Sequence, residues 1–190
     1  MAEVLLYNIR QDYDIERFKE IAKANDIAIR FAEKDDIDQK VGYLIGLPEY
    51  EKTEDNFEFD EDLDFDFILF IGFERDQLFA FLDLMRENSL TIQHKANETH
   101  NNVNWTLREL LIENDREGKM MGLIHRINGL MAHGHKLQEA YGVDDDIVKL
   151  TDEIQEYFDN SNIFEFEVAE KYHSRLRDEM MRYQDEKGIK

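Results

Sequence analysis

Apolar residues recur along the first hundred residues in two similar stretches. Each begins with a short run of consecutive apolar side chains, Val4–Tyr7 in the first and Phe67–Phe70 in the second. A segment with apolar residues three or four positions apart follows, and then a segment in which they alternate. These spacings are typical of a buried strand, an amphipathic helix and a half-exposed strand. The pattern predicts two strand–helix–strand repeats in tandem.

A shift of 63 residues superimposes the repeats, residues 4–31 and 67–94, without a gap. Apolar residues then match apolar residues, and one asparagine matches another, in the pairs Val4/Phe67, Leu5/Ile68, Leu6/Leu69, Tyr7/Phe70, Ile15/Leu78, Phe18/Phe81, Ile21/Leu84, Asn25/Asn88, Ile27/Leu90 and Ile29/Ile92. We interpret this as a duplication about a pseudo-twofold axis. Two such units commonly combine as the split βαβ plait. The predicted fold class is therefore α+β, with a duplicated βαβ, ferredoxin-like N-terminal domain over residues 1–115.

The segment between the repeats is strongly acidic. Thr53–Glu74 contains nine acids and no base, so residues 49–66 are expected to form an extended linker. Acids at every second position from Asp60 resemble a calcium loop, but Phe65 and Ile71 stand where glycine and glutamate are required. We expect this alternation to lead into a half-buried strand.

Local end signals mark several helices. Asp12 is expected to cap the first helix, and residues 38–48 could form a short helix ended by Gly46 and Pro48. Thr106–Glu109 has the T-x-x-E form of a capping box, which predicts a helix through Ile112.

Residues 116–190 are predicted to form an α-helical region of about three helices, over 117–140, 144–158 and 164–186. The first contains Gly118, Gly122, Gly129 and Gly134, which weaken an isolated helix and suggest close helix crossing. The third carries an apolar stripe that favours a helical hairpin or a dimer seam. Its members are Ala169, Tyr172, Leu176, Met180 and Tyr183.

The amino-acid composition disfavours several classes of partner and of functional site. The net charge is -21, which disfavours nucleic acid and anionic membranes as partners. There is no cysteine, hence no thiolate metal site or Cys nucleophile, and no apolar run approaches the ~20 residues that span a bilayer. The N-terminus has no basic stretch typical of a signal peptide. We expect a cytoplasmic protein.

Few residues indicate chemistry. Glu170 and His173 form an E-x-x-H pair, a spacing found in di-iron bundles, but the chain holds only one copy. His125, His133 and His135 are expected on a helix surface, because the first two are more than two turns apart. No Gly-x-Ser-x-Gly elbow or phosphate-binding glycine loop is present. The sequence predicts no catalytic residue and no cofactor; Glu170 and His173 remain the metal-binding alternative.

Several short blocks resemble a known family: Val4–Asn8, Gln39–Gly46, Tyr50–Thr53, Gly72–Phe73 and Asn104–Thr106. Together they are similar to a clostridial-type bacterial family catalogued as domain of unknown function 3783, over about residues 3–115. The resemblance implies no reaction, substrate or cofactor. Asn104, Trp105 and Tyr43 are the candidates for a groove or loop site, although the position of Trp105 at a helix start favours a core or capping role. The approach to the Asn-Trp pair, Lys95–Val103, departs from the threonine-rich family pattern.

These observations favour a non-enzymatic regulatory or protein-interaction module of uncharacterised function, with homodimerisation through the C-terminal helices as one arrangement. One alternative is a metal-binding protein or enzyme that uses the His and Glu groups of those helices. A second is an acidic decoy that binds a basic protein surface. A protein partner or self-association is expected, and the sequence does not identify a small-molecule effector.

Overall fold

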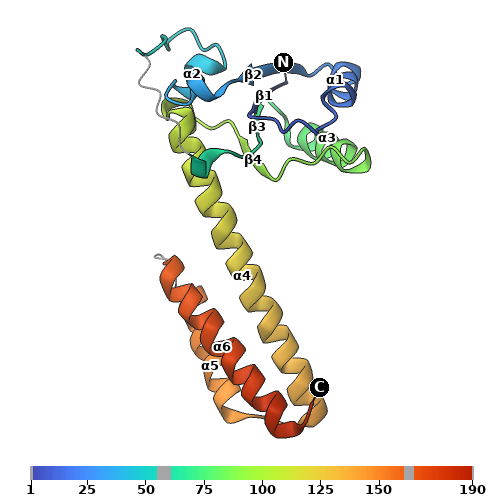
Figure 1. Ribbon diagram of the computed structural model, residues 1–190, viewed down its shortest axis with the longest axis vertical. Coiled ribbons are helices and arrows are strands. Elements are labelled where there is room, and N and C mark those ends of the chain that lie inside the picture. The colour runs from blue at the N-terminus through green and yellow to red at the C-terminus, as the bar shows by residue number, and fades with distance from the viewer. Residues whose placement is uncertain (1, 55–60, 161–164, 190) are drawn as a thin grey trace. The chain divides into compact units, whose positions relative to one another are not determined.

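The computed structural model describes residues 2–54, 61–160 and 165–189 (Figure 1). The chain divides into two compact units, Met1–Arg116 and Glu117–Lys190. The strands are β1 (Glu3–Tyr7), β2 (Ala28–Ala32), β3 (Phe67–Ile71) and β4 (His94–Asn97). The helices are α1 (Ile15–Ala24), α2 (Val41–Leu44), α3 (Arg75–Glu87), α4 (Leu107–Tyr141), α5 (Asp145–Asp159) and α6 (Phe166–Lys187). Short 3₁₀ turns are η1 (Lys34–Asp36), η2 (Glu61–Leu63) and η3 (Asn102–Asn104). The fold is a mixed α+β fold.

The four strands form one sheet in the order β2-β1-β3-β4. β1 pairs parallel with β2, β3 pairs parallel with β4, and the central pair is antiparallel. In a split βαβ plait, a strand of the other repeat would lie between the two strands of each repeat. Here the strands of each repeat are neighbours, so the predicted ferredoxin-like order is wrong. Periodicity identifies strands but does not determine which strands pair.

Helices cover both faces of this sheet (Figure 1). The α1/α3 core packs Val4, Leu6, Ile68 and Phe70 against Phe18, Ile21, Ala22, Phe81 and Met85. The α2/α4 core packs Leu5, Tyr7, Phe67, Leu69 and Ile71 against Val41, Ile45, Val103, Leu107, Leu110 and Leu111. Because β1 and β3 are buried on both faces, their sequences are continuous apolar runs rather than alternating ones.

The two repeats align differently in their strands and helices. Val4 lies in the α1/α3 core with Ile68, 64 residues later, whereas the gap-free alignment matched it with Phe67, which lies in the α2/α4 core. Phe18 and Phe81 share the α1/α3 core at the expected shift of 63. A one-residue slip in a strand moves every side chain to the other face. The alignment is therefore one residue off in the first strands.

The helices of the repeats end in the same way, at Asn25, Asp26 and Ile27 in the first and at Asn88, Ser89 and Leu90 in the second. Each asparagine side chain donates to the carbonyl four residues earlier, at 2.8 Å. The next residue has a φ of 56° or 58°. The following N–H returns to a helix carbonyl at 2.9 or 2.8 Å. The second repeat then reaches its strand later, because β4 begins at His94 whereas β2 begins at Ala28.

The N-cap of α1 differs from the predicted one. Asp14 is the N-cap, and its carboxylate accepts from the Arg17 N–H at 3.0 Å. Asp12, the predicted cap, instead forms an ion pair with Arg10 at 3.2 Å. The helix starts later than its polar signals suggested, because Tyr13 is buried in the α1/α3 core and holds the preceding loop against the sheet.

In the C-terminal unit, α5 and α6 pack with the C-terminal part of α4 (Figure 1). The stripe of α6 lies in this core, where Ala169, Leu176, Met180 and Tyr183 are buried with Leu123, Ile127, Ile147, Leu150 and Ile154. Of the two interpretations of that stripe, the hairpin within one chain describes its packing. The separate helices predicted through Ile112 and over 117–140 are one continuous helix, α4.

The glycines of α4 have different surroundings. A Cβ at Gly134 would lie 2.9 Å from the Met180 sulfur, so the expected close crossing occurs there. At Gly118 and Gly129 an added Cβ would meet nothing within 4 Å. Close packing within the described chain therefore explains only one of these positions.

The described ends of the predicted acidic linker are anchored. Asp64 accepts from Lys34 at 2.6 Å and from Asn8 at 2.8 Å, and these contacts lower its pKa. Leu63 is buried in the α2/α4 core. The middle of the linker, residues 55–60, lies outside the described residues.

Among the helices that the structure describes, none is both long and apolar enough to cross a bilayer.

Candidate functional site

Three of the blocks that resemble the family, Gln39–Gly46, Tyr50–Thr53 and Asn104–Thr106, meet on the α2/α4 side of the sheet. Gln39 is fully buried, and its side-chain amide binds the backbone of Thr53 as a neighbouring strand would. It donates to the Thr53 carbonyl at 3.1 Å and accepts from the Thr53 N–H at 3.0 Å. The backbone of residues 37–41 pairs with that of residues 105–108, including a bond of 2.8 Å from the Val41 N–H to the Trp105 carbonyl.

A second contact joins the glycine block to the Asn-Trp block. A Cβ at Gly42 would lie 2.4 Å from the Tyr50 ring, so this close approach requires glycine. The Tyr50 hydroxyl donates to Asn104 at 2.7 Å, and Asn104 donates to the His100 carbonyl at 3.0 Å. Trp105 is partly buried against the α2/α4 core. Asn104 and Trp105 thus hold η3 and α4 in place.

Tyr43, the third residue of the possible groove, lies on α2 and is partly buried. α2 contacts η3, so the three residues come from neighbouring elements. Their bonds are to other parts of the same unit, which favours a structural role for this set.

The predicted capping box is formed. The Thr106 N–H donates to the Glu109 carboxylate at 2.7 Å, and the Glu109 N–H donates to the Thr106 hydroxyl at 3.1 Å. The Thr106 N–H holds the pKa of Glu109 below its usual value. These bonds satisfy amide groups at the start of α4 that would otherwise be unpaired.

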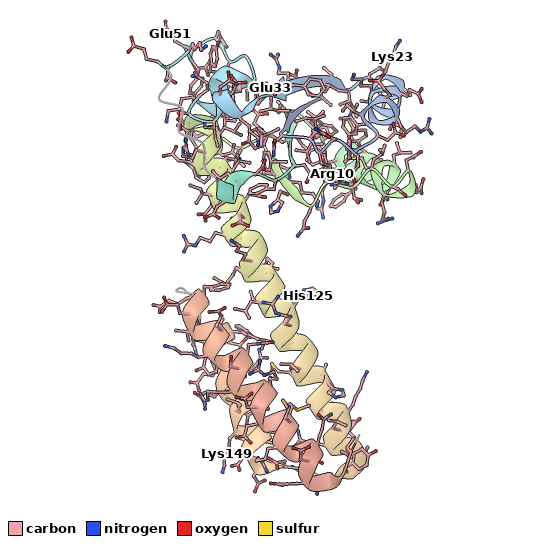
Figure 2. The ribbon with its side chains drawn as sticks, in the orientation of Figure 1. Arg10, Lys23, Glu33, Glu51, His125 and Lys149 are labelled. Atoms are coloured by element: carbon pink, nitrogen blue, oxygen red, sulfur yellow. The ribbon has the colours of Figure 1, made fainter. Side chains whose placement is uncertain are left out.

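Glu170 and His173 line one open hollow of about 700 Å³ between α4 and α6, with Arg126 and Lys171. Partial burial lowers the pKa of His173, and the Arg126 and Arg177 charges lower it further. No group of three or more His, Asp or Glu side chains is placed to hold a metal ion in residues 2–54, 61–160 and 165–189. His125 (labelled in Figure 2), His133 and His135 are exposed on α4, as expected.

The two edges of the sheet differ. At the β4 edge, Asn114 donates to the Lys95 carbonyl at 2.9 Å, and Asn102 donates to the Asn97 carbonyl at 2.9 Å. Asn102 is only 6% exposed and also accepts from the Thr99 N–H at 2.8 Å. Side chains therefore occupy backbone acceptors that a further strand would need.

The β2 edge carries no such cap in the described part of the chain. The Ala28 N–H donates to the Ala2 carbonyl at 3.1 Å, so Ala28 faces β1. Since successive strand residues direct their backbone groups to opposite sides, Ile29 and Phe31 direct theirs away from the sheet. The Phe31 side chain is 49% exposed. β2 is therefore an open edge with an apolar residue at its surface.

A cavity of about 350 Å³ lies at the carboxyl ends of β1 and β2. Its apolar lining includes Ile9, Tyr13, Ile15 and Phe31, and its polar lining includes Arg10 and Glu33, both labelled in Figure 2. Ligands of α/β proteins commonly bind outside the carboxyl ends of parallel strands. The open edge and this cavity share Phe31, and together they form the candidate site.

Two charged side chains, Arg10 and Glu33, line the cavity, and they differ in whether they form an ion pair. Arg10 pairs with Asp66 at 2.5 Å and lies over the Tyr13 ring. The Tyr13 hydroxyl donates to the Leu90 carbonyl at 2.8 Å, and burial raises its pKa, so it stays protonated. Among the described residues, no cationic side chain forms an ion pair with Glu33, whose carboxylate accepts from the Asp36 N–H in a capping box of η1. The site can hold an apolar group with a cation at its rim.

Sequence reasoning did not identify this site. The alternation of Ile27, Ile29 and Phe31 predicts a strand, but it does not indicate that this strand lies at an edge of the sheet. The lack of proline and lysine within Ala28–Ala32 is a signal that could have marked an unprotected edge.

Comparison with known proteins gives one match. Residues 66–121 match the model of a family described as Domain of unknown function (DUF3783). No significant match is found among curated proteins or among solved structures. The predicted resemblance over about residues 3–115 is thus confirmed for its second part, which includes the second repeat and the Asn-Trp block. The matched residues form β3, α3, β4 and the start of α4, so the similarity to this family covers less than half of the chain.

Proposed function

We propose that this protein is a non-enzymatic interaction module that binds an extended segment of a partner protein along β2. The observation that carries this proposal is the contrast between the edges: β4 has its outer carbonyls capped, whereas β2 leaves Ile29 and Phe31 available in the described chain. Strand addition at an open edge is a common mode of peptide recognition, in which backbone bonds supply affinity.

An extended peptide fits this edge better than a second copy does. Antiparallel pairing of two β2 strands centred on Arg30 would place that residue opposite itself, and because each Arg30 already pairs with Glu3 of its own chain at 2.6 Å, neither copy offers the other an opposite charge there. Each chain also carries a net charge of -21, so two copies repel at long range. The apolar stripe of α6, which motivated the homodimer, packs inside the C-terminal unit.

The test uses the full-length chain and a phage-displayed library of random twelve-residue peptides. Selected peptides are synthesised and their affinities measured by fluorescence anisotropy. Ile29→Pro removes an N–H that points away from β1, so the β1–β2 bonds remain, as for proline on other edge strands. We expect this variant to bind the peptides at least tenfold more weakly.

The matched control is Lys95→Pro on β4, whose backbone also points away from its partner strand and whose carbonyl is capped by Asn114. It should bind the peptides with unchanged affinity. Circular dichroism confirms that both variants are folded. Equal affinity of the Ile29→Pro variant and the unaltered chain, or the selection of no peptide, would overturn the proposal.

A further inference from the structure

The cavity at the carboxyl ends of β1 and β2 extends the edge in one direction. Phe31 and Leu6 are opposite each other in the parallel pairing, and both line the cavity. A residue of an added strand that lies opposite Phe31 has its side chain on this same face, about 5 Å away. That ligand residue is the one whose side chain reaches the cavity.

The size and lining of the cavity define what it takes. Its volume of about 350 Å³ is near the lower limit of ligand sites, which run from about 300 to 1,000 Å³. Ile9, Ile15 and Phe31 supply apolar walls. A single large apolar side chain suits this space, whereas the paired Arg10 offers no free cation for an anionic group.

Glu33 adds a second preference. It follows β2 with an extended backbone, at φ -98° and ψ 173°, and so continues the edge by one residue. It is exposed and lies two positions beyond Phe31, on the same face. Residues 1–116 hold 28 acids and 13 bases, so the surrounding field also attracts cations.

We infer that the cavity beside β2 selects peptides that carry a large apolar residue and, two positions away, a lysine or arginine facing Glu33. This inference rests on the proposed strand addition. An antiparallel peptide, the slightly more stable pairing, places the basic residue on the N-terminal side, in the order basic–any–apolar. A parallel peptide reverses that order.

The experiment repeats the phage selection on the unaltered chain and on the Glu33→Lys variant. Glu33 lies on the surface, so the exchange leaves the core intact and removes only the bond from the Asp36 N–H at the start of η1. Peptides selected on the unaltered chain should carry a basic residue two positions from the large apolar one. On Glu33→Lys that position should change to aspartate or glutamate. In the peptides, replacement of the apolar residue by alanine should weaken binding at least tenfold.

The Ile29→Pro variant separates the two proposals. Peptides that lose affinity for Ile29→Pro yet show no preference near Glu33, or tolerate alanine at the apolar position, would overturn the cavity inference and leave strand addition standing. Peptides that bind Ile29→Pro unchanged would overturn both. Asp26→Lys, at the other end of β2, is the matched charge control and should leave the selected pattern unchanged.

Discussion

The two strand–helix–strand repeats end their helices alike but present different edges. Asn25 and Asn88 make the same bond, and the chain turns back through the same backbone conformation. Beyond that point β2 remains open, whereas β4 lies beside Asn102 and Asn114 from the following segment. Local sequence therefore reproduces local structure, and the neighbouring segments decide whether an edge is available.

The largest expected effect tests whether the repeats contribute equally to the shared core. Phe18 and Phe81 are both buried, with ring centroids 5.9 Å apart. Phe18→Ala and Phe81→Ala should each lower the free energy of unfolding by about 3–5 kcal/mol, measured by urea denaturation. The double variant should deviate from additivity, because the rings touch.

Phe79→Ala is the control for this pair, since Phe79 is 54% exposed on α3. Its effect should be below about 1 kcal/mol. A cost for Phe18→Ala that is several times that of Phe81→Ala would show that the first repeat dominates the core.

The next effect concerns the edges themselves. Asn102→Ala removes two side-chain hydrogen bonds in a buried position and should cost about 1–3 kcal/mol, since it leaves the Thr99 N–H and Asn97 carbonyl unpaired. Phe31→Ala, at the open edge, should cost less than about 1 kcal/mol. Thermal unfolding measures both. Similar costs for the two variants would contradict the contrast between a structural edge and an available one.

A smaller effect compares the helix ends. Asn25→Ala should lower the free energy of unfolding by about 1 kcal/mol through its lost hydrogen bond. Asn88→Ala should cost more, because Asn88 also accepts from the Arg17 guanidinium at 3.0 Å. Urea denaturation of both variants and of Arg17→Ala decides the point. If Asn88→Ala still costs more than Asn25→Ala by the same amount when Arg17 is also replaced by alanine, the Arg17–Asn88 contact contributes nothing measurable to the free energy of unfolding.

The smallest effect depends on pH. The pKa of Glu109 is lower in the folded chain than in the unfolded chain, so its capping bonds stabilise the fold above the ordinary glutamate pKa and are lost as the pH falls through the folded value. Glu109→Gln should therefore reduce the slope of stability against pH in the acid range. The measurement is thermal unfolding in steps between neutral and acidic pH, and an unchanged slope would count against the capping contribution.

Much of the fold was predictable from short-range patterns. The first three strands, most of the helices, the capping box at Thr106 and the exposed histidines follow from period and end signals, whereas β4 lies beyond the predicted alternating segment with Leu90 and Ile92. The order of strands did not, and neither did the one-residue slip between the repeats. Both depend on contacts between residues far apart in the chain, which a comparison of apolar positions cannot detect.

By itself, the sequence determined most of the strands and helices, because side-chain period and capping groups act within a few residues, but it indicated neither β4 nor the continuity of α4. Only the tertiary structure decided that β2 and β4 are edges, that Asn102 and Asn114 cap one of them, and that Phe31 lines a cavity beside the other. A strand is an edge when no other segment pairs with its outer side, and whether one does depends on where the rest of the chain packs.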